Sequence, residues 1–146
     1  MPHAREFAAA AEALAGVRWR RHGRNPVAGL DCGGLPVAAL AAVGIVAADS
    51  RDYDAAMPPA EFLWRMCRSN GAEQPWSDAG EGRLALCSWG SVSEPRHLAI
   101  MLTRRRIVHV DAAVRPRRVV VVPASWLDGK LVAVFRMHGL DYGAPW

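Results

Sequence analysis

The stretch GLDCGGL, residues 29–35, decides how the first half of the chain is expected to fold. It places a thiol between an aspartate and two glycines, after a basic run and before an apolar run that continues to about residue 43. Proline is tolerated only in the first turn of a helix, so Pro36 predicts a helix that begins at or next to Cys32 and ends at Gly44. This helix is apolar on every side, which is typical of a helix in the middle of a core.

Two further helices are predicted from apolar residues at helical spacing, over residues 3–16 and 59–69. Residues 49–58 and the stretch SNGAEQPWSDAGEG are rich in turn formers and are predicted as loops. From residue 84 the apolar period becomes two, and the predicted strands are LALCSW, HLAIML, RIVHV, RRVVVV and KLVAVFRM. Helices followed by strands predict an α+β fold, with N-terminal helices packed on a C-terminal antiparallel sheet of about five strands.

The length of the chain favours one domain over residues 1–146, and its cysteine content favours reduced thiols. The three cysteines fit neither a disulfide framework nor a paired zinc motif, and are predicted to be free thiols. Residues 1–16 lack the layout of a secretory signal, so synthesis in the cytoplasm without export by the general route is expected. Prolines, glycines and Asp31 interrupt the apolar stretch 26–48, so we expect no membrane span.

The net charge of +4 comes from 17 arginines and one lysine against 14 acidic residues. Arginines cluster at residues 18–24, 103–106 and 115–118. Such clusters bind phosphates in nucleic-acid-binding proteins. Neither a recognition helix nor a sheet with exposed aromatic side chains accompanies them here, so no nucleic-acid partner is expected. A solvated surface, or a face that meets an acidic polymer or partner, explains the charge equally well.

Cys32 is the residue best placed for chemistry. Unpaired N–H groups and the helix dipole at a helix N-terminus favour a thiolate, and the two glycines that follow allow close approach of a substrate. Cys67 falls in a helical pattern and Cys87 in an apolar strand, where a thiol is usually inert.

A thiol that performs acyl transfer needs a base, and the base needs a group that orients it. His97 opens one predicted strand and His109 lies near the end of the next. A hairpin that folds about Thr103 puts the two side chains opposite each other, whereas a turn centred further on separates them by several ångströms. A zinc site formed by Cys32, His97 and His109 is an alternative interpretation, although no acidic fourth ligand supports it.

Taken in order, the motifs GxxWRxxGRxPxxGLDCGGL, RHLAIML and RIVHV resemble the NlpC/p60 cell-wall cysteine peptidases over roughly residues 7–136. The resemblance implies a papain-like fold and cleavage of peptide stems in bacterial peptidoglycan. It assigns the nucleophile to Cys32, the general base to His97 and the orienting group to His109, with Asp111 as an alternative to His109. No cofactor and no catalytic metal are implied.

Two positions depart from the pattern of that family. Gly33 stands where serine is usual, and Trp19 stands where a tyrosine commonly borders the site. The resemblance places Trp19, Asp31 and Gly33 in the substrate-binding and oxyanion part of the site, and an indole N–H has a different reach from a phenol.

The HGRxPxxGLDC variant most resembles peptidases encoded among the tail genes of phages and gene transfer agents. This resemblance implies a peptidase carried on a tail tip that opens the cell wall during docking, with tail-tip or hub proteins as partners. The surface over residues 49–82 and the C-terminal residues 138–146 are the expected contact regions. A structural tail component with weak or no catalysis is the alternative, and a transferase or amidase with the same thioester chemistry also fits.

Overall fold

The structure is a computed structural model that describes residues 1–54, 58–88, 94–113 and 115–143. Within these ranges the α-helices are α1 (Ala4–Glu12), α2 (Gly34–Ala42) and α3 (Ala60–Asn70), and two short 3-10 helices are η1 (Trp76–Asp78) and η2 (Ala124–Leu127). The three predicted helices are confirmed. None of the described helices has the length and apolar character that crossing a membrane requires.

The main sheet is antiparallel and has six strands in the order β3-β8-β4-β5-β6-β7. Its members are β3 (Gly71–Gln74), β4 (Arg83–Ser88), β5 (Pro95–Met101), β6 (Arg106–His109), β7 (Val120–Pro123) and β8 (Leu131–Met137). A separate small hairpin joins β1 (Arg24–Asn25) to β2 (Gly29–Leu30) just before α2. The predicted α+β fold is therefore confirmed.

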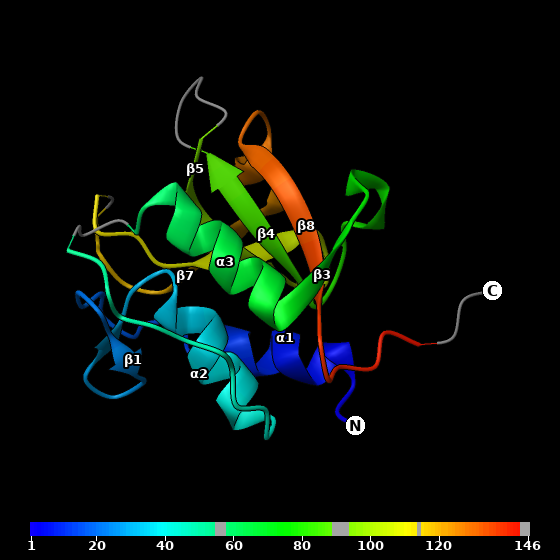
Figure 1. The fold of residues 1–146 in the computed structure, drawn as a ribbon, viewed down its shortest axis with the longest axis horizontal. Coiled ribbons are helices and arrows are strands. Elements are labelled where there is room, and N and C mark those ends of the chain that lie inside the picture. The colour runs from blue at the N-terminus through cyan, green and yellow to red at the C-terminus, as the bar shows by residue number, and fades with distance from the viewer. Residues whose placement is uncertain (55–57, 89–93, 114, 144–146) are drawn as a thin grey trace.

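The larger core lies between the helices and one face of the sheet. Phe7 of α1, Leu40 of α2 and Leu63 of α3 are buried against Leu86 and Ile100 of the sheet. Figure 1 shows α3 lying along the sheet, with α1 and α2 together at one end of it. Full burial of such side chains is worth about 1.5–3 kcal/mol each, so these contacts fix α2, which begins just after Cys32, against the sheet.

A second, smaller core covers the opposite face of the sheet. Ala85 and Cys87 of β4, Met101 of β5 and Ile107 of β6 pack there against Leu127 of η2. This face carries both predicted site histidines, as their contacts with η2 show below.

The strand β3 was predicted as loop, and this prediction is wrong. Its sequence GAEQ is polar, and only Gly71 is buried. It is an edge strand that pairs on one side alone, with β8, so its side chains need no apolar alternation. Residue 89 of the predicted strand LALCSW, residues 55–57 of the predicted loop and residues 144–146 of the C-terminal contact region lie outside the described residues.

The hairpin between β5 and β6 is centred on Arg104. Ile100 pairs with Val108 and Met101 with Ile107, and the Leu102 N–H donates to the Arg106 carbonyl at 2.8 Å. The turn therefore spans three residues, 103–105, of which Arg104 and Arg105 have positive φ. Continuing this register puts His109 across from the residue two positions beyond His97. The directly opposed arrangement considered from the sequence is therefore wrong, and the two histidines are diagonal neighbours.

Candidate active site

Asp31 fixes the start of α2 and thereby the position of Cys32. Its carboxylate is buried, and Oδ1 accepts a hydrogen bond of 2.8 Å from the backbone N–H of Gly34, the first residue of the helix. A side-chain acceptor at this place satisfies one of the N–H groups that a helix leaves unpaired at its beginning. Cys32 is thus held in the turn between β2 and α2.

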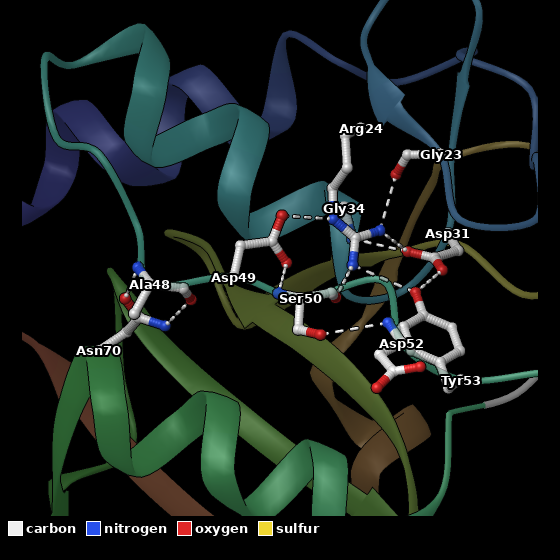
Figure 2. A network of polar contacts seen from close by, with 10 residues as sticks. All are labelled: Gly23, Arg24, Asp31, Gly34, Ala48, Asp49, Ser50, Asp52, Tyr53 and Asn70. Carbon is white, nitrogen blue, oxygen red and sulfur yellow. Dashed lines mark hydrogen bonds and ion pairs between the residues drawn. The ribbon is translucent and has the colours of Figure 1, made fainter.

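Arg24 on β1 binds Asp31 and ties a distant loop to it (Figure 2). Its Nη1 lies 2.7 Å from Asp31 Oδ1, and its Nε donates to Asp49 Oδ2 at 2.8 Å. Its Nη2 donates to the Ser50 carbonyl and to the Tyr53 hydroxyl, each at 3.1 Å. The Tyr53 hydroxyl in turn donates to Asp31 Oδ2, so both oxygens of the buried carboxylate have partners.

Cys32 itself is 5 % exposed, and burial raises the pKa of its thiol. The charges of Asp31 and Asp111 raise it further, while a hydrogen bond from the Leu98 N–H and the charge of Arg24 lower it. The thiol is therefore protonated at rest. The sequence predicts a thiolate favoured by the helix N-terminus, whereas in the structure burial is the largest influence and raises the pKa of the thiol.

The sulfur of Cys32 lies where β5 and β6 separate. The ladder between these strands ends at Ile100 and Val108, and the Leu98 N–H beyond it donates to the sulfur. Leu98 follows His97 directly in the chain. Between described residues no hydrogen bond joins the sulfur to an imidazole. The thiol therefore hydrogen-bonds to the backbone of β5, the strand that carries His97, and not to the His97 ring.

The structure brings His97 and His109 together. Both are 2 % exposed, and His97 Nε2 lies 2.9 Å from His109 Nδ1 with the rings close to perpendicular at 87°. A diagonal pair on neighbouring strands is within reach of aromatic side chains, which is why the two rings meet despite the register. The shifted register therefore makes the two residues diagonal neighbours without preventing contact between their rings.

Trp126 of η2 packs against both imidazoles. Its ring centroid lies 4.3 Å from that of His109 and 5.8 Å from that of His97. Burial lowers the pKa of His97 to about 3, with a contribution from the neighbouring His109, and burial lowers the pKa of His109 to about 4. Both rings are neutral at neutral pH, so one of the two facing nitrogens carries the proton that they share.

Asp111 is buried in the same region, but its hydrogen bond goes elsewhere. Its Oδ1 accepts from the Ala113 N–H at 2.7 Å, and within the described part of the chain Oδ2 has no hydrogen-bond partner. Burial raises the pKa of this carboxyl. Of the two residues considered for the orienting role, His109 contacts the His97 ring, whereas Asp111 acts on Cys32 through its charge.

The two glycines after Cys32 have different surroundings. A Cβ on Gly33 would meet the side-chain ends of Arg24 and Met66 at 3.4 and 3.5 Å, which is ordinary contact. A Cβ on Gly34 would lie 1.8 Å from the Gly23 carbonyl oxygen. Gly34 therefore serves the close packing of α2 on the preceding loop, a role that the sequence did not indicate.

Trp19 lies beside Leu30, with which it forms an isolated bridge, and is half-buried against the larger core. Its backbone N–H donates to the Arg117 carbonyl at 2.7 Å. The hydrogen bonds found for Trp19 among the described residues are those of its backbone, and its assignment to the oxyanion site stays a prediction.

For a metal, the described residues provide no group of three or more His, Cys, Asp and Glu side chains with suitable geometry. The zinc interpretation of Cys32, His97 and His109 therefore lacks a ligand cluster among them. All three cysteines are described, buried and free, and burial raises the pKa of Cys67 and brings that of Cys87 to about 12.

A cavity of about 140 Å³ lies between α3 and the loop that Arg24 anchors. Phe62, Arg65 and Met66 line it on one side and Asp49 and Ser50 on the other.

Sequence reasoning missed Arg24, Tyr53 and Trp126. Arg24 was counted in a basic cluster, and its ion pair with Asp31 is visible only once the β1–β2 hairpin has formed. Tyr53 and Trp126 reach the site from segments far along the chain, and no local pattern marks them.

The buried histidine pair predicts how stability depends on pH. Both pKa values are lowered from 6.5, to about 3 and about 4, so between pH 6.5 and 4 the unfolded chain binds more protons. The contribution of the two histidines to the free energy of unfolding is fully present above pH 6.5 and is lost as the pH decreases. The total loss is several kcal/mol, at about 1.4 kcal/mol per pKa unit. Urea unfolding at a series of pH values measures this slope.

The matched control is the double variant His97→Gln with His109→Gln, which removes both shifted groups. Asp111 has a raised pKa and contributes a slope of opposite sign, but it does so in both proteins. The difference between the two pH profiles therefore isolates the histidines, and parallel profiles would contradict their buried neutral state.

Comparison with known proteins relates this geometry to a fold family. No protein-family profile and no curated protein matches the chain. Solved structures do: an NlpC/p60 family protein from Bacillus cereus ATCC 10987 superposes with a TM-score of 0.70 at 19% identity, covering 93% of this chain and 40% of that one. The chain has the NlpC/p60 fold.

Two further structures match at a similar level. The NlpC/p60 domain of the peptidoglycan hydrolase SagA has a TM-score of 0.63 at 23% identity, with 92% of this chain and 99% of that domain covered. The peptidoglycan hydrolase RipB from Mycobacterium tuberculosis has a TM-score of 0.66 at 18% identity, with 95% and 65% covered. Solved neighbours of this chain are thus peptidoglycan hydrolases, and at these identities the likeness is one of fold.

Proposed function

We propose that the chain is a cysteine peptidase that hydrolyses peptide stem bonds of bacterial peptidoglycan through a thioester. The observation that carries this proposal is the buried 2.9 Å contact between His97 and His109, next to the strand residue that donates to the Cys32 sulfur. The NlpC/p60 fold and its peptidoglycan-hydrolase neighbours support the choice of substrate.

The imidazole pair can supply a base in one tautomer. When His97 donates its Nε2–H to His109 Nδ1, the lone pair of His97 is on Nδ1, and that nitrogen can take a proton. His109 thereby holds both the ring orientation and the tautomer of His97, which is the role of the third member of a catalytic triad.

The reaction then starts from a neutral thiol and a neutral imidazole. The thiol proton of Cys32 passes to His97 as the sulfur bonds to the carbonyl carbon of the stem peptide. The C–N bond breaks, and His97 returns the proton to the leaving amine. Water, deprotonated by His97, hydrolyses the thioester and releases a carboxylic acid.

The oxyanion forms beside the start of α2. The Cys32 N–H at this helix beginning is one donor, and the Trp19 indole is the proposed second donor, with Asp31 and Gly33 shaping the turn around them. One such donor is typically worth about 3 kcal/mol, so the contribution of Trp19 affects rate more than reaction type. The excess of arginine fits a substrate rich in carboxylates.

Digestion of purified sacculi tests the proposal. Wild-type protein is expected to release soluble stem-peptide fragments, and Cys32→Ala is expected to release none above background, because alanine cannot form the thioester. Thermal unfolding of both proteins controls for the fold. Equal release by both proteins, or release by neither at any accessible pH, would rule the peptidase out.

A structural role with weak or no catalysis is the second candidate. The 5 % exposure of Cys32, its raised pKa and the location of both imidazoles on the η2 side of the sheet favour it. Release by neither protein in the sacculus experiment is the result this second candidate expects.

We further propose a place of action, on the resemblance of the HGRxPxxGLDC segment to tail-encoded peptidases. The peptidase is made in the cytoplasm, assembles with tail-tip or hub proteins of a phage-like particle, and opens the wall as the particle docks. The surfaces over residues 49–82 and 138–146 are the proposed contacts. Co-purification with intact particles, rather than with the soluble fraction of lysed cells, is the outcome expected.

A further inference from the structure

Arg24 is the central residue of a polar network that holds Asp31, the residue before the proposed nucleophile (Figure 2). Its side chain is 12% exposed and that of Asp31 only 1%. All three guanidinium nitrogens bind: Nη1 to Asp31, Nε to Asp49, and Nη2 to the Ser50 carbonyl and the Tyr53 hydroxyl. A fork of fixed donors suits a network of this kind better than the point charge of a lysine.

The network joins segments that the sequence keeps apart. The centroid of the Tyr53 ring lies 4.5 Å from that of Phe62 of α3 and 4.6 Å from that of His22 in the basic loop. Its hydroxyl donates a hydrogen bond to Asp31. Arg24 and Tyr53 together therefore clamp the residue that precedes Cys32 between the β1–β2 hairpin and the loop 49–53.

The charge of Asp31 works against Cys32. A carboxylate next in the chain to a buried thiol disfavours the thiolate, and Asp111 acts in the same direction from the end of β6. The opposing groups are Arg24 and the Leu98 N–H of β5. Without Arg24, Asp31 would be an uncompensated buried charge beside the sulfur.

We propose that Arg24, assisted by Tyr53, is a positioning residue for Cys32: it holds the Asp31 carboxylate in the geometry that caps α2 and neutralises that carboxylate's charge next to the sulfur. The inference rests on the proposed function only in taking Cys32 as the nucleophile. It concerns the reactivity of the thiol, which is measurable without peptidoglycan.

The test is the rate at which iodoacetamide alkylates Cys32 in the whole protein between pH 6 and 10, resolved by peptide mass spectrometry. Arg24→Gln is expected to slow alkylation of Cys32 on the order of tenfold, the change that one pKa unit makes in the thiolate fraction. Arg24→Lys, which keeps the charge but not the fork of donors, should be slowed less than Arg24→Gln without reaching the wild-type rate. Tyr53→Phe, which removes only the hydroxyl, should also give a smaller loss than Arg24→Gln. Arg20→Gln is the matched control, because Arg20 is exposed in the same segment.

The direction of the change separates positioning from mere stability. Loss of fold exposes all cysteines, so a structural role predicts faster alkylation of Cys32, Cys67 and Cys87 together. An Arg24→Gln rate equal to that of Arg20→Gln, or a common increase at the three cysteines, overturns the inference. If the slowing is seen while wild-type protein leaves sacculi intact, the clamp stands and the peptidase proposal fails.

Discussion

Replacement of Gly34 by alanine is expected to destabilise the protein by about 3 kcal/mol or more, because the backbone cannot make room for the new methyl group. The added Cβ would lie 1.8 Å from the Gly23 carbonyl oxygen and 3.0 Å from the Gly23 carbonyl carbon. Both atoms belong to the backbone, so α2 or the preceding loop has to move. Urea unfolding measures the change.

Gly33→Ala is the matched control, since it adds the same methyl group one residue earlier. Its Cβ would meet side-chain atoms of Arg24, Met66 and Asp31 at 3.4, 3.5 and 3.6 Å, all ordinary contacts, and the expected cost is less than about 1 kcal/mol. Equal stability of the two variants would show that α2 is not packed on the Gly23 backbone as described.

His97→Gln is expected to lower the rate of stem-peptide release by about 10³-fold, within the range that a general base contributes. Glutamine keeps a polar side chain of similar size on β5 but has no basic nitrogen that could take the thiol proton. Because His97 is neutral at neutral pH, the variant should keep most of its stability there. Initial rates of fragment release at pH 7, with unfolding curves for each protein, measure both effects.

His138→Gln carries the same substitution at an exposed position and should leave the rate unchanged. His109→Gln should give a smaller loss than His97→Gln, because His109 acts on the substrate only through the His97 ring. Rates for His97→Gln and His138→Gln that agree within error would remove His97 from the mechanism.

The helices and most strands could be predicted because their burial patterns are local. Pro36 indicates where α2 begins, and this feature is read from the sequence alone. The uniform apolar run predicts burial on every side, whereas Ala41 and Ala42 at the end of α2 are exposed. The strand β3 was missed because an edge strand is held by backbone pairing with β8 and needs no apolar alternation.

The candidate site was predictable only in part, for a related reason. The pairing of His97 with His109 follows from two neighbouring strands, although the turn at Arg104 changed the register and left the contact diagonal. The burial of Cys32 and the neutralisation of Asp31 by Arg24 depend on segments that meet only after folding. The sequence motif identifies a thiol near the start of a helix. The charged groups that set the pKa of this thiol come together only in the tertiary structure.

The central claim is that Cys32 becomes acylated by a stem peptide, and the mass of the trapped intermediate tests it most directly. Wild-type protein mixed with excess synthetic stem peptide and quenched in acid within the first turnovers should gain the mass of the acyl fragment on the peptide that contains Cys32. Cys32→Ser should show no such mass on a thiol. Turnover by wild-type protein with no acyl group on Cys32, or with the acyl group on another residue, would contradict the account.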